Sequence, residues 1–215
     1  MALPMLTINA GVDLAESEAK AVFVAEGEYV ESIVTAASLF GGYESAGWTR
    51  DIDGHPTTVT AASAFAVATK VFSFVIVQGF VINGEAGSVA ESFGVLVRSS
   101  SIVTGNRING GARPTSYGVF HEEGTSLLVN NTIEGGAGSV ASYAVKQTGG
   151  TMDVIENGID GGSGDRSFGF VNYGNGSGKA NLVGNDIDGG VGETASSAFY
   201  CSNSPYLFFH WSPIP

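Results

Sequence analysis

The chain has 215 residues, 32 of them glycine, and its 21 acidic and 9 basic residues give a formal net charge of −12. This acidic balance argues against a nucleic-acid partner and against an anionic membrane surface, because both attract Lys and Arg. A hydrophobic content of 43% excludes a disordered chain, and the single cysteine, Cys201, excludes an intrachain disulfide. We therefore expect one folded domain over residues 1–215.

The N-terminal residues predict a short helix and no leader. Residues 1–9 lack the basic and apolar regions of a signal peptide, so we expect none in this chain, and the localisation stays open. Residues 12–20 (VDLAESEAK) predict an amphipathic helix, with Asp13, Glu16 and Glu18 early and Lys20 late, as the helix dipole favours. We interpret this helix as a cap over the strands that follow.

Residues 21–61 contain short β-rich runs interrupted by an inserted loop at 44–56. Trp48 in this loop has two interpretations. It is either a platform that stacks on a sugar or, as we favour, an anchor that holds the loop against the first strands.

The stretch 61–82 has the length of a membrane span. Lys70 and Gln78 interrupt it, and its Phe, Val and Ile residues suit buried strands better. We expect no membrane span here.

An internal repeat runs through residues 75–203. Its asparagines and its isoleucines are each spaced 25, 26 and 28 residues apart. One landmark reads GNRINGG (105–111), NNTIEGG (130–136), ENGIDGG (156–162) and GNDIDGG (184–190). The second reads SFGV (92–95), SYGV (116–119), SYAV (142–145), SFGF (167–170) and SSAF (196–199). A sustained period of this kind indicates a solenoid or an array.

Each repeat holds three short apolar runs separated by Gly, Asn and Ser, which are too short for helices. This pattern predicts an all-β parallel β-helix of roughly eight coils, with successive coils about 4.8 Å apart. Propeller blades need more residues, and the frame of leucine-rich repeats is absent. The calcium-binding nonapeptide recurs every nine residues, so it does not fit this period.

Equivalent residues in such a coil stack in ladders. We expect an inward isoleucine ladder and an asparagine ladder at a tight turn, since Asn tolerates left-handed backbone and bonds its neighbour along the axis. We also expect an aromatic stack, with the valines two positions later on the same face. The members are Ile108, Ile133, Ile159, Ile187; Asn106, Asn131, Asn157, Asn185; Phe93, Tyr117, Tyr143, Phe168; and Val95, Val119, Val145, Phe170, Phe199.

The positions after the inward valines should point outward. They are Leu96, Phe120, Lys146 and Val171, followed two residues later by Arg98, Glu122, Thr148 and Tyr173. Such a mixed surface either holds an oligosaccharide or a protein, or is an ordinary solvated face, which is the simpler interpretation.

The residue after each ladder isoleucine has an acidic or an amide side chain. These residues are Asn83, Asn109, Glu134, Asp160 and Asp188, with Asp165 and Asp186 expected nearby. Stacked carboxylates repel, and Ca²⁺ would relieve this repulsion; a solvated acidic ridge is the alternative. Because His55, His121 and His210 lack metal-ligand spacing, we expect no metal site on them and no cofactor, and we place His121 at a turn or core edge.

Residues 204–215 break the repeat and are rich in aromatic and apolar side chains. We expect this segment to cap the last coil or to form an interface between two copies of the chain.

The opening strands resemble those of bacterial right-handed parallel β-helix proteins of the pectin-lyase-like superfamily. The resemblance rests on VFVAEGEYVESI (22–33), SLFGGYE (38–44), GWTRD (47–51) and TTV (57–59), and the later repeats extend it over nearly the whole chain. It implies a right-handed solenoid and a secreted or cell-surface location. It does not specify an activity, because this architecture hosts lyases, hydrolases and surface proteins.

The sequence contains neither the His-Gly and Arg-x-Lys patterns of galacturonan hydrolases of this fold nor a nucleophile elbow. We therefore favour a non-catalytic binding or structural protein with a carbohydrate or protein partner, and assign no catalytic residues. The alternative is a polysaccharide lyase or glycoside hydrolase that acts on an acidic polysaccharide.

Overall fold

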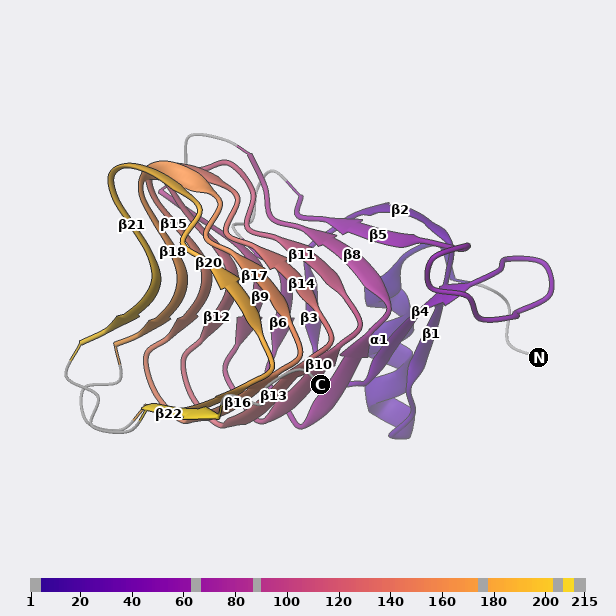
Figure 1. The fold of residues 1–215 in the computed structure, drawn as a ribbon. Helices are drawn as coiled ribbons and strands as arrows, with labels where there is room; N and C mark the ends of the chain where they lie inside the picture. The colour runs from indigo at the N-terminus through magenta and orange to yellow at the C-terminus, as the bar shows by residue number, and fades with distance from the viewer. Residues whose placement is uncertain (1–4, 63–66, 87–89, 174–177, 203–206, 211–215) are drawn as a thin grey trace.

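Three parallel sheets build the molecule. The computed structural model describes residues 5–62, 67–86, 90–173 and 178–202, and the backbone of 207–210 (Figure 1). The chain visits the sheets in turn, so that each strand pairs with the equivalent strand one coil later. The result is a parallel β-solenoid with one short helix at its N-terminal end, and this confirms the predicted all-β fold.

The first and second sheets contain eight and seven strands, respectively. The first consists of β1 (Val22–Ala25), β4 (Leu39–Tyr43), β7 (Val75–Gln78), β10 (Ser101–Thr104), β13 (Thr125–Val129), β16 (Thr151–Ile155), β19 (Lys179–Val183) and β22 (Leu207–His210). The second consists of β2 (Gly27–Val30), β5 (Thr57–Thr60), β8 (Phe80–Asn83), β11 (Arg107–Asn109), β14 (Thr132–Glu134), β17 (Gly158–Asp160) and β20 (Asp186–Asp188).

The third sheet has seven strands, several of which are much longer than those of the other sheets. It consists of β3 (Ile33–Thr35), β6 (Val67–Val71), β9 (Glu91–Val97), β12 (Thr115–His121), β15 (Ala137–Gln147), β18 (Ser163–Asn172) and β21 (Val191–Cys201). Figure 1 shows that β15, β18 and β21 bend, so that this sheet is concave on its outer side.

The predicted isoleucine ladder fills the coil interior. Ile108, Ile133, Ile159 and Ile187 pair in register along the second sheet. Ile133 is fully buried, whereas Ile187 in the last coil is partly buried. Each fully buried side chain of this size contributes roughly 1.5–3 kcal/mol, so the ladder is a main source of stability.

The asparagine ladder is also confirmed. Asn106, Asn131 and Asn157 are each 2% exposed and join end to end through their side-chain amides. The ladder begins at the backbone N–H of Phe80, which donates to Asn106 Oδ1 at 3.0 Å, and it ends at Asn185. Buried amides of this kind are stable only because their donors and acceptors find partners.

The helix differs from its predicted boundaries. α1 spans Ile8–Glu18, because Thr7 caps it by accepting a hydrogen bond from the Ala10 N–H and Ala19 ends it in a left-handed conformation. Its first turn has no acidic residue and its last turn no basic one, so the predicted match to the helix dipole is wrong. The helix buries Ile8, Val12 and Ala15 and contacts β1 and β3, as a cap does.

Two stretches singled out in the sequence lie in strands or between them. The apolar stretch 61–82 contains β6, β7 and most of β8, and no helix among the described residues is long and apolar enough to cross a membrane. The inserted stretch 44–56 connects β4 to β5. Of the C-terminal segment 204–215, only the backbone of β22 is described, and it extends the first sheet by pairing with β19. The expected cap or interface otherwise lies outside the described residues.

Candidate functional site

The outer face of the third sheet gathers the side chains that the repeat places in register. Along β12, Ser116 points inward and Tyr117 outward; Gly118 and Val119 both face the interior, and Phe120 points outward again. The alternation slips at Gly118, where an added Cβ would lie 2.7 Å from Ile133 Cγ2. This slip brings two rows of outward side chains close together on one concave face.

One expectation is therefore wrong. The aromatic residues and the valines two positions later do not share a face, because Tyr117 belongs to an outer apolar cluster and Val119 to the core. The extra interior residue at Gly118 breaks the two-residue period of a regular strand.

Four aromatic rings form a column along this face, the aromatic column. Phe93 and Tyr117 stack at 4.8 Å between ring centroids, and Tyr143 stacks on Tyr117 and on Phe168 at 5.2 Å each. Their planes differ by no more than 12°. Since all four residues are at most 8% exposed, their ring faces contact each other rather than solvent. Each such contact adds about 0.5–1.5 kcal/mol beyond burial, so the column is a second, outer core.

Glu91 is hydrogen-bonded to the aromatic column. The Tyr117 hydroxyl donates to Glu91 Oε1 at 3.0 Å, and burial together with this carboxylate raises the pKa of Tyr117. Burial also raises the pKa of Tyr143. Both hydroxyls are therefore neutral donors at physiological pH.

Lys146 lies in the second outward row, in register with Phe120 and Val171. Its Nζ lies 5.0 Å from the Tyr117 ring centroid and 4.9 Å from that of Tyr143. The rings of Phe120 and Tyr173 are at 5.4 and 5.3 Å. Burial lowers the pKa of Lys146, partly offset by the charge of Glu91. A half-buried ammonium among four rings is held by cation–π attraction, an arrangement the sequence analysis missed.

This face carries charges of both signs. Four of the nine basic residues of the chain, all nine in described parts, are on its strands or directly after them: Lys70, Arg98, Lys146 and Arg166. Four acidic residues are placed in the same way: Glu91, Glu122, Asp165 and Glu193. Glu91 binds Tyr117, and Glu122 forms an ion pair with Arg98 that raises the pKa of Arg98. A molecule with a net charge of −12 therefore has, on this face, as many basic as acidic side chains.

The predicted outward row is confirmed in position but is more covered than expected. Leu96 is 5% exposed and Val171 is fully buried. The accessible part of the face lies toward the last coil, where Tyr200 is 41% exposed and Arg166 is exposed. Tyr200 contacts Phe168 at 5.8 Å and Tyr173 at 5.5 Å and so extends the aromatic column to the surface.

The row of side chains after the ladder isoleucines lies on the outside of the second sheet. Its members pair in register and are Asn83, Asn109, Glu134, Asp160 and Asp188. Several of them accept a hydrogen bond from the backbone two residues later. Asp160 Oδ1 accepts from the Gly162 N–H at 2.8 Å, and Asp188 Oδ1 accepts from the Gly190 N–H at 2.8 Å. Asp186 starts β20 and Asp165 lies in β18. In the described parts of the chain, no three His, Cys, Asp or Glu side chains group as metal ligands.

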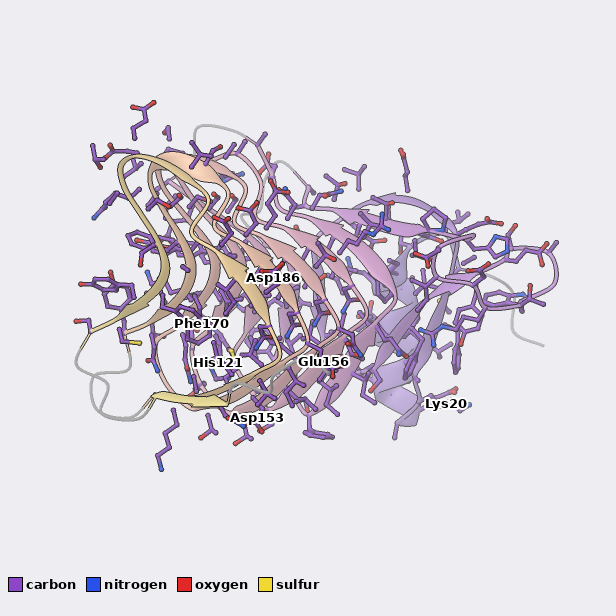
Figure 2. All side chains as sticks on the ribbon, in the orientation of Figure 1. Lys20, His121, Asp153, Glu156, Phe170 and Asp186 are labelled. Carbon is purple, nitrogen blue, oxygen red and sulfur yellow. The ribbon has the colours of Figure 1, made fainter. Side chains whose placement is uncertain are left out.

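The histidines occupy unrelated positions. His121 lies inside the coil at the end of β12 (Figure 2), where it is fully buried and its Nδ1 lies 3.0 Å from the Gly149 carbonyl oxygen. Burial lowers its pKa from 6.5 to about 4. His55 Nδ1 lies 2.9 Å from Glu26 Oε2, and this contact lowers the pKa of Glu26. The side chain of His210 lies outside the described residues.

Trp48 lies at the opposite end of the molecule from Tyr200. Its indole packs against Tyr43 at 6.1 Å, and its backbone N–H donates to the Glu44 carbonyl at 3.1 Å. These contacts agree with the anchoring interpretation, although the side chain remains 46% exposed.

No protein-family model, curated protein or solved structure matches the chain.

Proposed function

We propose that this protein is a non-catalytic binding module that takes an acidic carbohydrate chain along the outer face of its third sheet. The single observation that carries the proposal is the ammonium of Lys146 among aromatic rings, beside the exposed Arg166 and Tyr200, on the one sheet face described above where basic and acidic residues balance in an otherwise acidic molecule. A polymer lying along the axis would meet Lys146 and Arg166 on the neighbouring strands β15 and β18.

The chemistry of this face favours carbohydrate. Lys146 and Arg166 supply charge for carboxylates, and Tyr143 and Tyr173 supply neutral hydroxyl donors. Tyr200 offers a ring surface on which a sugar ring stacks. The overall negative charge is screened beyond about 8 Å at physiological salt, so it does not keep an acidic polymer away from these two cations.

The resemblance of residues 22–33, 38–44, 47–51 and 57–59 to the pectin-lyase-like superfamily supports a common setting, and the parallel β-solenoid agrees with it. We propose this superfamily as its evolutionary setting and a secreted or cell-surface location.

Calorimetric titration with galacturonan and alginate oligosaccharides, and with neutral dextran oligosaccharides, tests the proposal. We expect the acidic chains to bind, with affinity that falls as salt rises, and the neutral chains to bind weakly. Arg166→Gln should weaken binding roughly fivefold, about 1 kcal/mol. Arg107→Gln, which removes the same charge from the second sheet, should have no effect.

Equal binding by both variants or no preference for acidic chains would contradict the binding face. Appearance of shortened or unsaturated oligosaccharides during the titration would contradict the non-catalytic assignment. Binding of a protein partner in an Arg166-dependent manner, without binding of any saccharide, would replace carbohydrate by protein.

A further inference from the structure

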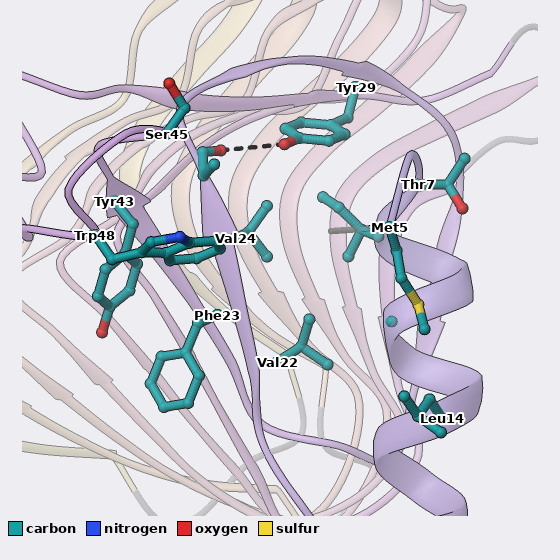
Figure 3. Close-up of a pocket in the computed structure, with 13 residues that line it drawn as sticks. Met5, Thr7, Leu14, Val22, Phe23, Val24, Tyr29, Tyr43, Ser45 and Trp48 are labelled. Carbon is teal, nitrogen blue, oxygen red and sulfur yellow. Dashed lines mark hydrogen bonds between the residues drawn. The ribbon is translucent and has the colours of Figure 1, made fainter. Parts of the chain in front are cut away.

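A second site lies at the N-terminal end of the solenoid, on residues that take no part in the proposed carbohydrate face. The hollow there, which we call the N-terminal hollow, has a volume of about 710 Å³ (Figure 3). It is lined by residues of α1 and the segment before it, of β1 and of the turn after β4, among them Met5, Leu14, Phe23, Tyr43 and Trp48. This volume falls in the range of small-molecule sites.

The lining is apolar and accessible. Phe23 is 54% exposed, Trp48 46%, Met5 44% and Leu14 40%. None of the lining residues carries a charge. Grouped apolar side chains of this size, open to solvent, are characteristic of binding sites rather than of ordinary protein surface.

The walls are held in place by three carboxylates that lie outside the lining. Glu31 accepts hydrogen bonds from the backbone N–H groups of Ile8 and Asn9 at the start of α1. Glu26 accepts from Ser45, and Glu44 accepts from the Thr49 hydroxyl. The start of α1 and the turn after β4, which form two sides of the hollow, are thus held in place before a ligand binds. This reduces the entropy cost of binding.

The aromatic wall shows a strained backbone. Trp48 has a φ of 55°, a conformation that a bulky side chain rarely adopts. It places the indole beside Tyr43, which in turn meets Phe23 edge to face at 5.5 Å. Figure 3 shows these three rings on one side of β1. Met5 and Leu14 lie on the other side, toward α1. This backbone conformation holds the indole against Tyr43 at the wall of the hollow.

We propose that the N-terminal hollow binds a neutral, apolar small molecule with a flat ring body. A flat body lying across the free edge of β1, the terminal strand of its sheet, would contact the three rings on one side and the aliphatic helix side on the other. Anions are disfavoured, because the three carboxylates Glu26, Glu31 and Glu44 lie behind the uncharged lining and outnumber the one cation that packs on it, Arg50, at 5.5 Å from the Tyr43 ring centroid.

Two probes with the same anilinonaphthalene body test the proposal. N-phenyl-1-naphthylamine is neutral, and 1-anilinonaphthalene-8-sulfonate carries one negative charge. We expect the neutral probe to bind one per chain and to quench Trp48 fluorescence by energy transfer in a Trp211→Phe background. The sulfonate should bind at least roughly tenfold more weakly.

Leu14→Glu places a charge in the hollow at a solvent-exposed helix position and should lower the affinity for the neutral probe at least roughly tenfold. Ser17→Glu adds the same charge to the same helix outside the lining and should leave the affinity unchanged. Absence of saturable binding, equal binding of both probes, or equal effects of the two variants would overturn the proposal. So would light scattering that shows a dimer which Leu14→Glu dissociates, since a second copy would then occupy the hollow.

Discussion

Asn131 donates two hydrogen bonds to a single atom, Asn157 Oδ1: one from its backbone nitrogen at 2.9 Å and one from its Nδ2 at 2.9 Å. The same Nδ2 also donates to the Val103 carbonyl at 2.8 Å. The Asn131 side-chain oxygen in turn accepts from the backbone and side chain of Asn106. Each asparagine of the ladder thus satisfies buried groups of the coils before and after it.

Replacing this residue should therefore cost more than one hydrogen bond. In Asn131→Ala, the Val103 carbonyl and the Asn106 backbone N–H lose the side chain that bonds them, and Asn106 Nδ2 keeps only its bond to the Val77 carbonyl, so we expect a loss of about 3 kcal/mol in the free energy of unfolding. Asn185→Ala removes the equivalent bonds to Asn157 and Val154, but at the half-buried end of the ladder, where water can replace them, so it should cost about 1 kcal/mol. Urea denaturation of both variants measures the difference. Equal losses would contradict a ladder whose interior members each support two coils.

Two glycines of neighbouring repeats should respond in opposite ways to alanine. A Cβ at Gly135 would collide with the Gly161 carbonyl oxygen and the Ser142 hydroxyl, whereas a Cβ at Gly158 would meet nothing within 4 Å. We expect Gly135→Ala to destabilise the protein by about 1–3 kcal/mol through overpacking. Gly158→Ala should stabilise it by about 0.4–1 kcal/mol, because the unfolded chain loses freedom. Thermal melting of the pair checks both signs; a common sign would refute the packing of the coils at Gly135.

The acidic row on the second sheet offers a test of charge repulsion. Asp160 lies in register between Glu134 and Asp188, and its Oδ1 accepts from the Gly162 N–H. Asp160→Asn keeps this acceptor and removes the repulsion, so we expect about 0.5 kcal/mol of stabilisation. Asp160→Ala removes both and should be less stable than Asp160→Asn by about 1 kcal/mol. Melting in millimolar Ca²⁺ and in chelator provides the control: a Ca²⁺-dependent rise that Asp160→Asn abolishes would mean that the row binds the cation instead.

Burial of His121 should make stability depend on pH. Its pKa is lowered from 6.5 to about 4. Between these two pH values the imidazole is therefore protonated in the unfolded chain and neutral in the folded chain. The stability contributed by the neutral imidazole is therefore complete above pH 6.5 and is lost as the pH falls toward 4. The loss is about 1.4 kcal/mol per pH unit, or about 3 kcal/mol in total.

His121→Gln is the matched variant, because Gln147 occupies the same register position one coil later. Urea denaturation between pH 7 and 4 should show a shallower decline for the variant than for the wild type. Carboxylates titrate equally in both proteins, so the difference reports the histidine alone. Parallel curves would show that His121 takes up its proton while folded.

The repeat allowed much of the fold to be predicted, because in a solenoid a residue's neighbours are the residues one period away. The ladders of Ile133 and Asn131 follow directly from their spacing. The helix boundaries did not follow, since Thr7 and Ala19 decide them through local capping geometry rather than through periodicity. The shared face expected for Tyr143 and Val145 was wrong, because the strand's alternation slips between them.

Periodicity by itself determined the parallel pairing, the coil interior and the stacked rings, since these depend only on which residues recur at one position. Tertiary structure alone decided what the outer surfaces became. The surroundings of Lys146 come from three coils, and the N-terminal hollow joins a helix, a strand and a turn that share no repeat position. Sequence spacing specifies neighbours along the axis, whereas the curvature of the sheets and the docking of the cap bring together residues that no period relates.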